Sequence, residues 1–479
     1  MERTQLLSVG IDIGTSTSQL VFSRLTVENK AGYFSVPSVS IIRKEVFYQS
    51  PIYRTPLLDQ TRIDGEALEK ILDQEYKVAG IAPGQVETGA VIITGESARK
   101  ENAGMILERM SRFAGDFVVS TAGPDLEAVI AGQGSGAWQF SERQGTTVIN
   151  LDIGGGTTNV VLFDRGRVRA KGSVDIGGRQ VRIDKDGFLS CLSPSASRIG
   201  KECGLKMEEG ERISQKMLEQ LCDGMCRILE ELVGARKPSA LLEAVRTAGS
   251  TPFCLPEDCH VKYLCFSGGV ADCMGRRQSE LFPYGDIGVL LAEAIQRSRL
   301  FRDFSIISAD QTIRATVIGA GSHTTSISGS TISYAEKLLP LKNMPVLKLS
   351  PEEEELCWQG DFKNLRKKAA WFLAQNDTAG IALAIRGRYD PGYQEMKSFA
   401  KALAMGLDPI LEPGIPLLFI IEADMAKALG QLLRRELAGR RLVLAVDEIR
   451  TEPNDFVDFG RPVMNGLVVP VVVKTLIFG

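Results

Sequence analysis

The sequence predicts an α/β fold in which two similar lobes face each other and a third α/β domain follows. The length of 479 residues corresponds to about three domains of ~150 residues each. Residues 7–17 and 147–158 share one pattern, an apolar run followed by Asp-Ile-Gly and small hydroxyl or glycine residues. The two aspartates stand 140 positions apart (152 − 12). The repeat predicts a strand, a tight turn and a second strand in each lobe.

We assign residues 1–145 to the first lobe. Behind its strand–turn–strand unit, short polar and β-like runs near 28–65 predict an insertion or an extension of the sheet. Further along this lobe, buried apolar runs and helical spacing predict two strands and a helix, at 90–94, 117–120 and 126–131.

The second lobe is expected over residues 146–330. Its longest predicted helix, 208–233, places apolar residues at helical spacing along one face. The other elements expected in this lobe are two strands and two helical segments, at 168–176, 263–266, 286–299 and 314–321.

A composition shift rich in Ser, Thr and Gly at 322–333 predicts a loop or an edge hairpin before the third domain, 331–479. Ser350 and Pro351, followed by Glu353, combine a helix cap, proline in the first turn and an acid at the third position. These residues predict a helix start. The rest of the domain is predicted to alternate helices with strands, at 397–405, 417–421, 425–437, 442–446 and 467–474.

Composition excludes several classes of protein. The chain has 56 Lys and Arg against 59 Asp and Glu, a net charge of −3, which argues against nucleic acid as the main partner. No apolar run approaches the ~20 residues of a membrane span, so no membrane partner is expected. The nine cysteines are an odd number in a long chain, which favours reduced thiols in a cytoplasm.

The two Asp-Ile-Gly turns carry the chemistry. A turn rich in Gly, Ser and Thr leaves backbone N–H groups free to point at an anion. The turns Gly14–Thr17 and Gly154–Thr158 could therefore cradle a polyphosphate from opposite sides. Each turn carries one aspartate, Asp12 or Asp152, placed to hold Mg²⁺ directly or through water. A single turn of this kind can be a plain hairpin, but the matched pair favours a nucleotide site.

In order along the chain, five segments resemble the motifs of the actin–Hsp70–sugar kinase superfamily. The two turns resemble its first and second phosphate motifs. Residues 265–271, an apolar strand ending in Gly-Gly, are similar to its adenosine motif. Residues 124–132 and 315–321 resemble its two connecting helices.

The resemblance implies an actin-like ATPase fold with two RNase H-like lobes around an interlobe cleft that binds ATP and Mg²⁺. Asp12 would hold the metal, Asp152 would hold the metal or orient the attacking water, and Glu127 would help to position that water. Gly268 and Gly269 would let adenosine sit against the backbone, and Gly319 would allow close packing of the connecting helices. The other implied nucleotide contacts are Gly14, Thr15, Ser16, Thr17, Gly154, Gly155, Gly156, Thr157 and Thr158.

Two positions depart from the superfamily pattern. Actin and Hsp70 use a lysine of the first lobe near the phosphates, and the corresponding position here, seven residues after Asp12, is Gln19. Residues 174–178 resemble the Hsp70 segment that follows the second phosphate turn, but Arg179 stands where Hsp70-like proteins have an acid. The departures predict a slow ATPase.

Within the superfamily, the chain most resembles the ethanolamine ammonia-lyase reactivating factor family, the EutA family. The resemblance covers residues 8–22, 86–96, the second turn and 455–474. It implies a chaperone-like ATPase whose client is ethanolamine ammonia-lyase, an adenosylcobalamin enzyme from which the factor expels damaged cofactor. It also implies a cytoplasmic protein that can associate with a bacterial microcompartment and form a homo-oligomer.

Two alternatives stay open at this point. One is a small-molecule kinase of the sugar kinase type, which needs a carboxylate base beside a hydroxyl substrate. Asp116, Asp125 and Asp175 are the candidates for that base. The other alternative is a scaffolding or filament-forming relative of actin.

Overall fold

A computed structural model gives the fold of the chain. It describes residues 3–15, 17–29, 39–59, 62–95, 97, 100–110, 113, 119–121, 123–275, 282–323, 325–328, 332–376, 378–453, 455–462, 466 and 468–475.

The first sheet has the strand order β3-β2-β1-β5-β6, with β4 pairing β2. Strands β1 to β3 are antiparallel neighbours, whereas β5 runs parallel to β1 and β6 parallel to β5. The helices α1 and α2 cover one face. The bounds are β1 Arg3–Ile13, β2 Thr17–Asn29, β3 Val39–Gln49, β4 Tyr53–Arg54, α1 Gly65–Ala79, β5 Thr88–Ile93, α2 Ala103–Met110 and β6 Val119–Thr121.

The second sheet repeats this topology in the order β9-β8-β7-β12-β13. Strands β7 to β9 are antiparallel, and β12 and β13 follow parallel to β7. Two lobes with this order confirm the predicted pair of RNase H-like lobes. The bounds are β7 Thr147–Ile153, β8 Thr158–Asp164, β9 Arg167–Val174, β12 Tyr263–Ser267 and β13 Ser305–Ile307.

The repeat also explains the segment near 28–65. Strand β3 occupies the place in the first sheet that β9 occupies in the second, so residues 39–49 extend the sheet rather than form an insertion. Residues 30–38 lie outside the described part of the chain.

The remaining elements of the second lobe lie outside its sheet. The helix predicted at 208–233 begins only at Gln215, because Gly210 adopts a positive φ of 86° and Ser214 caps the helix by accepting the N–H of Met217 at 3.3 Å. Similarly, the helix predicted at 286–299 divides at Ser298, which caps α10. The bounds are α4 Ala137–Gln144, β10 Val181–Ile183, β11 Leu189–Leu192, α5 Pro194–Glu202, α6 Gln215–Leu232, α7 Ala240–Ala244, α8 Gly268–Asp272, α9 Gly288–Arg297 and α10 Arg299–Asp303.

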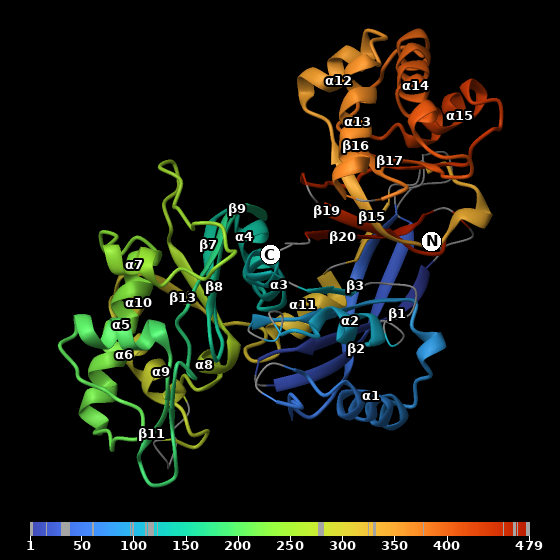
Figure 1. The fold of residues 1–479 in the computed structure, drawn as a ribbon. Helices are drawn as coiled ribbons and strands as arrows, with labels where there is room; N and C mark the ends of the chain where they lie inside the picture. The colour runs from blue at the N-terminus through green and yellow to red at the C-terminus, as the bar shows by residue number, and fades with distance from the viewer. Residues whose placement is uncertain are drawn as a thin grey trace.

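Two helices cross between the lobes. Helix α3 (Pro124–Gly134) packs against β7, β8 and β9, whereas α11 (Ala315–His323) packs against β1, β2 and β5. A Cβ on Gly134 would lie 1.9 Å from the carbonyl oxygen of Ala315, and one on Gly319 would lie 2.1 Å from that of Ile130. The two helix backbones therefore touch, which confirms the packing role expected of Gly319. Figure 1 shows α3 and α11 between the two lobes.

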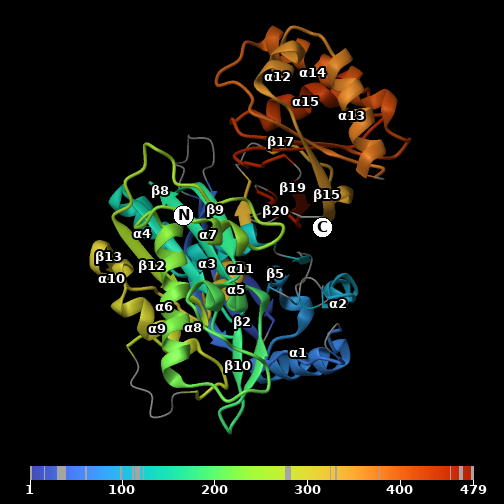
Figure 2. The ribbon, with the colours of Figure 1, turned by 60° about the vertical axis from the view of Figure 1, so that its left-hand side comes forward.

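The third sheet, in the order β14-β20-β19-β15-β16-β17-β18, combines parallel strands β15 to β18 with antiparallel β14, β19 and β20. Figure 1 shows that this sheet and its helices stand above the first lobe. Figure 2 shows them from a second side. The predicted helix start at Ser350 is confirmed as a capping box with Glu353. The bounds are β14 Thr325–Ile327, β15 Leu341–Lys348, α12 Pro351–Trp358, α13 Lys363–Asn376, β16 Ala382–Ile385, α14 Tyr393–Leu407, β17 Leu417–Ile421, α15 Ala426–Glu436, β18 Val443–Val446, β19 Asp455–Phe459 and β20 Pro470–Thr475.

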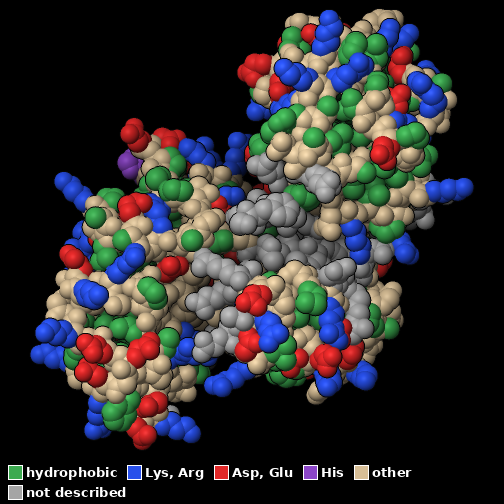
Figure 3. All heavy atoms as spheres, in the orientation of Figure 1, with side chains coloured by type: hydrophobic (Ala, Val, Ile, Leu, Met, Phe, Trp, Pro, Cys, Tyr) green, Lys and Arg blue, Asp and Glu red, His purple; other side chains and the backbone are tan. Residues whose placement is uncertain are grey.

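The surface in Figure 3 carries charged side chains of both signs, interspersed over the lobes and the third sheet's helices. In the part of the chain that the structure describes, no helix is both long and apolar enough to cross a membrane.

We expect Gly134→Ala to destabilise the protein although alanine favours helices. The added Cβ would overlap a backbone oxygen that cannot move without separating α3 from α11, and such overpacking costs about 1–3 kcal/mol. The midpoint of thermal unfolding should fall. Gly104→Ala is the control, because a Cβ there meets nothing within 4 Å in α2. Equal midpoints for the two variants would contradict the close crossing.

Candidate functional site

The two predicted turns have the same backbone hydrogen bond. The N–H of Gly14 donates to the carbonyl oxygen of Thr17 at 2.9 Å, and that of Gly154 donates to Thr157 at 2.9 Å. A Cβ on Gly156 would meet nothing within 4 Å, so this turn faces open space. Of the predicted contacts, Ser16 lies outside the described residues. The structure therefore places matched, accessible turns at the ends of β1 and β7.

Hydroxyl groups from distant segments hold the first turn. Thr55 Oγ1 and Ser97 Oγ donate to the carbonyl oxygen of Gly14 at 2.7 and 3.0 Å. Ser18 Oγ lies 3.0 Å from Thr55 Oγ1 and extends this contact into β2. Sequence reasoning missed Thr55 and Ser97, because neither stands in a motif near the turn.

A neighbouring backbone segment holds the second turn. The N–H groups of Gly178 and Arg179 donate to the carbonyl oxygens of Gly154 and Gly155 at 3.0 and 2.7 Å. A Cβ on Gly177 would lie 2.4 Å from the carbonyl oxygen of Gly155, which explains why position 177 is a glycine. Thr158 is a predicted nucleotide contact. Its hydroxyl instead donates a hydrogen bond to the carbonyl oxygen of Ile176 at 2.8 Å.

Asp12 and Asp152 stand at equivalent strand ends, both buried. Burial raises the pKa of Asp12 to about 7, although hydrogen bonds from Thr94, at 3.0 Å, and Gln19 favour its charged form and Asp152 opposes it. Burial also raises the pKa of Asp152 to about 6, against a 2.6 Å hydrogen bond from Ser267 Oγ. The two carboxylates are therefore close enough for the charge of Asp152 to raise the pKa of Asp12.

Glu127 joins these two carboxylates from the first turn of α3. Burial raises its pKa well above the ordinary value of 4.5, and the charges of Asp152 and Asp12 add to the shift. The backbone N–H of Gly95 and the amide of Asn159 donate to its carboxylate. The structure thus brings together the predicted trio of Asp12, Asp152 and Glu127, which come from three different elements.

The environment of the trio fits a divalent cation held partly by another ligand. No salt bridge between described residues involves any of the three carboxylates, and their hydrogen-bond donors are neutral. Buried carboxylates without a counter-charge favour an incoming cation. Among the residues that the structure describes, no cluster of three acidic, His or Cys side chains could hold a metal alone. Mg²⁺ commonly binds through one or two carboxylates together with phosphates and water.

The Gly-Gly pair lies beside the second turn. Gly268 has a φ of 89°, and a Cβ there would lie 2.3 Å from the carbonyl oxygen of Ile153, at the end of β7. A Cβ on Gly269 would meet nothing within 4 Å, so this position faces open space. The structure therefore places both glycines at the second turn, whereas Gly319 lies in the helix crossing.

Comparison with known proteins decides the family. The model of the family described as "Ethanolamine utilisation protein EutA" matches residues 4–479. The ethanolamine ammonia-lyase reactivases EutA of Salmonella typhimurium and Escherichia coli are 38% and 37% identical to the chain, and each alignment covers 100% of both proteins. The chain belongs to the EutA family.

Solved structures are more distant from this EutA family chain. A Ppx/GppA family member from Aquifex aeolicus is 17% identical, with a TM-score of 0.36, and the match covers 67% of this chain and 87% of that one.

The alternative kinase interpretation gains no support from the described carboxylates. Asp125 accepts hydrogen bonds from Ser250 Oγ at 2.9 Å and from the N–H of Thr251 at 3.1 Å. Asp175 accepts the hydroxyl of Thr247 at 2.8 Å. Both are occupied by the protein's own donors, and Asp116 lies outside the described residues.

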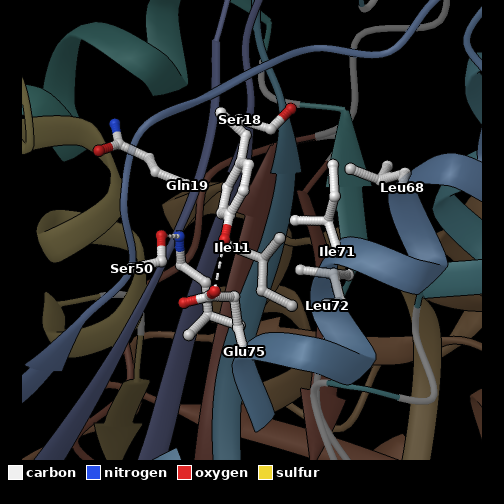
Figure 4. Close-up of a pocket in the computed structure, with 10 residues that line it drawn as sticks. Ile11, Ser18, Gln19, Ser50, Leu68, Ile71, Leu72 and Glu75 are labelled. Atoms are coloured by element: carbon white, nitrogen blue, oxygen red, sulfur yellow. Dashed lines mark hydrogen bonds between the residues drawn. The ribbon is translucent and has the colours of Figure 1, made fainter. Parts of the chain in front are cut away.

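A separate pocket lies inside the first lobe, between β2 and α1. Figure 4 shows apolar side chains of Leu68, Ile71 and Leu72 beside Glu75. Glu75 is buried and accepts hydrogen bonds from the hydroxyls of Tyr48 and Tyr53 at 2.7 and 2.6 Å. Because its carboxylate oxygens are both taken, we assign this pocket a structural role.

The raised pKa values predict a pH dependence of stability. The folded protein binds protons to Asp12 and Asp152 up to about pH 7 and 6, whereas these groups ordinarily release them near 3.8. The folded state therefore holds more protons, and the free energy of unfolding without ligand should fall as pH rises from about 4 to about 7.

Asp12→Asn should reduce this fall. Thermal unfolding midpoints of the ligand-free protein at about pH 5 and about pH 8, in the presence of a chelator, would measure it. Asp223→Asn, which changes an exposed carboxylate on α6, is the control. An unchanged fall in the Asp12 variant would show that this carboxylate is not the source.

Proposed function

We propose that the chain is an ATP-dependent reactivating factor for ethanolamine ammonia-lyase. It would act as a chaperone-like ATPase that releases damaged cobalamin so that intact adenosylcobalamin can bind. One observation carries the ATPase part of the proposal. Two matched turns face three buried carboxylates that have only neutral donors. Full-length similarity to two reactivases supports the client.

The residues would divide the work as follows. The turns Gly14–Thr17 and Gly154–Thr158 would bind phosphate oxygens through backbone N–H groups, one turn from each lobe. Asp12 and Asp152 hold Mg²⁺, which supplies positive charge to the phosphates when it is bound. Glu127, whose pKa is raised, is suited to orient the attacking water and to receive a proton from it. Gln19 adds no positive charge, which keeps hydrolysis slow.

ATP hydrolysis would act on the client by changing the position of the two lobes relative to each other. Contacts from both turns to one triphosphate keep the lobes closed, and loss of the γ-phosphate removes contacts from Gly154–Thr158. Each hydrogen bond to a charged oxygen contributes about 1.5–3 kcal/mol. A few such bonds approach the ~5.5 kcal/mol that moves a two-state equilibrium from 1:99 to 99:1.

The other assignments are part of the same proposal. We divide the chain into lobes at 1–145 and 146–330 and a C-terminal domain at 331–479. Strand β14 from before the last boundary joins the third sheet, and α3 and α11 each pack on the sheet of the opposite lobe. We place the factor in the cytoplasm, in association with a bacterial microcompartment, where it works on its client as a homo-oligomer.

Reactivation of the client tests the function. Inactivated ethanolamine ammonia-lyase should regain activity with the protein, ATP, Mg²⁺ and fresh adenosylcobalamin. Asp152→Asn keeps the side-chain shape but loses the charge, so it should bind nucleotide and lose about 10²-fold or more in turnover. Phosphate release and binding of a fluorescent ADP would be measured on the same preparation. Unchanged turnover would refute the role of Asp152, and no reactivation by the unaltered protein would refute the function.

Client affinity should depend on the nucleotide. By resemblance to the family, we expect tight binding of the client with ADP and release with ATP. Affinity for ethanolamine ammonia-lyase would be measured with ADP and with a non-hydrolysable ATP analogue. A ligand can shift a conformational equilibrium only by its difference in affinity for the two states. Equal client affinities would therefore eliminate this coupling even if ATP were hydrolysed.

A further inference from the structure

Two buried amide side chains occupy equivalent positions in the two hairpins. Gln19 pairs in register with Asp12 across β1 and β2, and Asn159 pairs with Asp152 across β7 and β8. Both amides are nearly inaccessible, with exposures of 5% and 2%. The lobe repeat therefore places one amide beside one aspartate twice.

The neighbours of each amide fix its orientation. The Gln19 Nε2 donates to the carbonyl oxygen of Ile313 at 3.1 Å, and the same amide donates to Asp12. The Asn159 amide donates to the carboxylate of Glu127. Because these neighbours are acceptors, the NH₂ groups face them, and each amide oxygen remains as an acceptor that these neighbours do not use. Figure 4 shows the Gln19 amide extending away from Leu68, Ile71 and Leu72.

Both amide oxygens are left without a donor. Gln19 Oε1 and Asn159 Oδ1 are buried and have no hydrogen-bond partner among the described residues. A buried acceptor without a partner costs about 1–3 kcal/mol. Two such acceptors at matched positions beside the carboxylates point to a bound species that donates hydrogen bonds to both lobes.

The chemistry of the cleft limits what this species can be. Once a cation holds the three carboxylates in their charged form, the carboxylates and the two amide oxygens only accept hydrogen bonds. Phosphate oxygens also accept, so a nucleotide alone cannot satisfy them. Water bound to a divalent cation donates O–H groups and brings positive charge.

We propose that Gln19 and Asn159 are positioning residues that accept hydrogen bonds from the water shell of a divalent cation, one from each lobe. The proposal rests on the nucleotide site proposed above and adds two residues to it. A neutral amide at both positions leaves the positive charge to the cation. Nucleotide binding therefore depends on the cation more strongly than it would with a lysine at position 19.

Cobalt(III) hexammine is the probe that tests the proposal. Its six ammines donate hydrogen bonds as bound waters do, and they do not exchange for protein ligands. Calorimetry on the full chain without nucleotide should detect binding, with competition by Mg²⁺. Gln19→Leu and Asn159→Leu each remove one acceptor and should weaken binding about tenfold, since 1.4 kcal/mol corresponds to a factor of ten.

Matched variants separate this effect from misfolding. Gln19→Glu restores an acceptor and should bind the hexammine at least as tightly as the unaltered chain. Gln215→Leu makes the same change on the exposed start of α6 and should leave binding unchanged. Gln19→Lys should make ADP binding less sensitive to removal of Mg²⁺, because the ammonium replaces part of the cation's charge.

Two results would overturn the proposal. In the first, both leucine variants bind cobalt(III) hexammine as tightly as the unaltered chain does. The other is tight binding of Mn²⁺ with ADP but no binding of the hexammine, which indicates direct coordination by the carboxylates. In both cases nucleotide still binds and the proposed function stands. If no adenine nucleotide binds with any cation, the nucleotide site itself fails.

Discussion

The contact between the backbones of α3 and α11 is the constraint on which the site depends. Each helix packs on the sheet of one lobe, so their crossing sets where the two sheets lie relative to each other. Glycines at 134 and 319 allow this approach because a side chain there would overlap a carbonyl oxygen of the other helix. With the sheets held this way, the ends of β1 and β7 face each other, and Asp12 comes within electrostatic range of Asp152.

The crossing also explains the electrostatic character of the cleft. Helix α3 begins at the space between the turns, so Glu127 in its first turn adds a third carboxylate to the two aspartates. Burial makes their charged forms costly, and the neutral donors around them offset only part of that cost. A site of this kind gains most from a ligand that brings cationic charge. The arrangement favours an anion that arrives together with cationic charge over a bare anion.

The third sheet stands apart from this chemistry. Its parallel strands β15 to β18 follow one another in chain order, and the core beneath their helices contains the Trp358 and Phe399 rings stacked 3.9 Å apart. Its first helix, α12, begins at a cap residue, Ser350, which the sequence pattern predicted. The third sheet therefore has a hydrophobic core of its own beside the two lobes.

The sequence alone determined what depends on local pattern. The repeated Asp-Ile-Gly turns predicted both hairpins, and hydrophobic periodicity predicted most strands and helices, although Gly210 and Ser214 moved the start of α6. The contacts of Thr55 and Ser97 with the first turn could not be predicted, since residues distant in the chain meet only after the sheets form. The unpartnered oxygens of Gln19 and Asn159 likewise became visible only with the fold. Burial and hydrogen-bond satisfaction are properties of the packed molecule, and no single segment carries them.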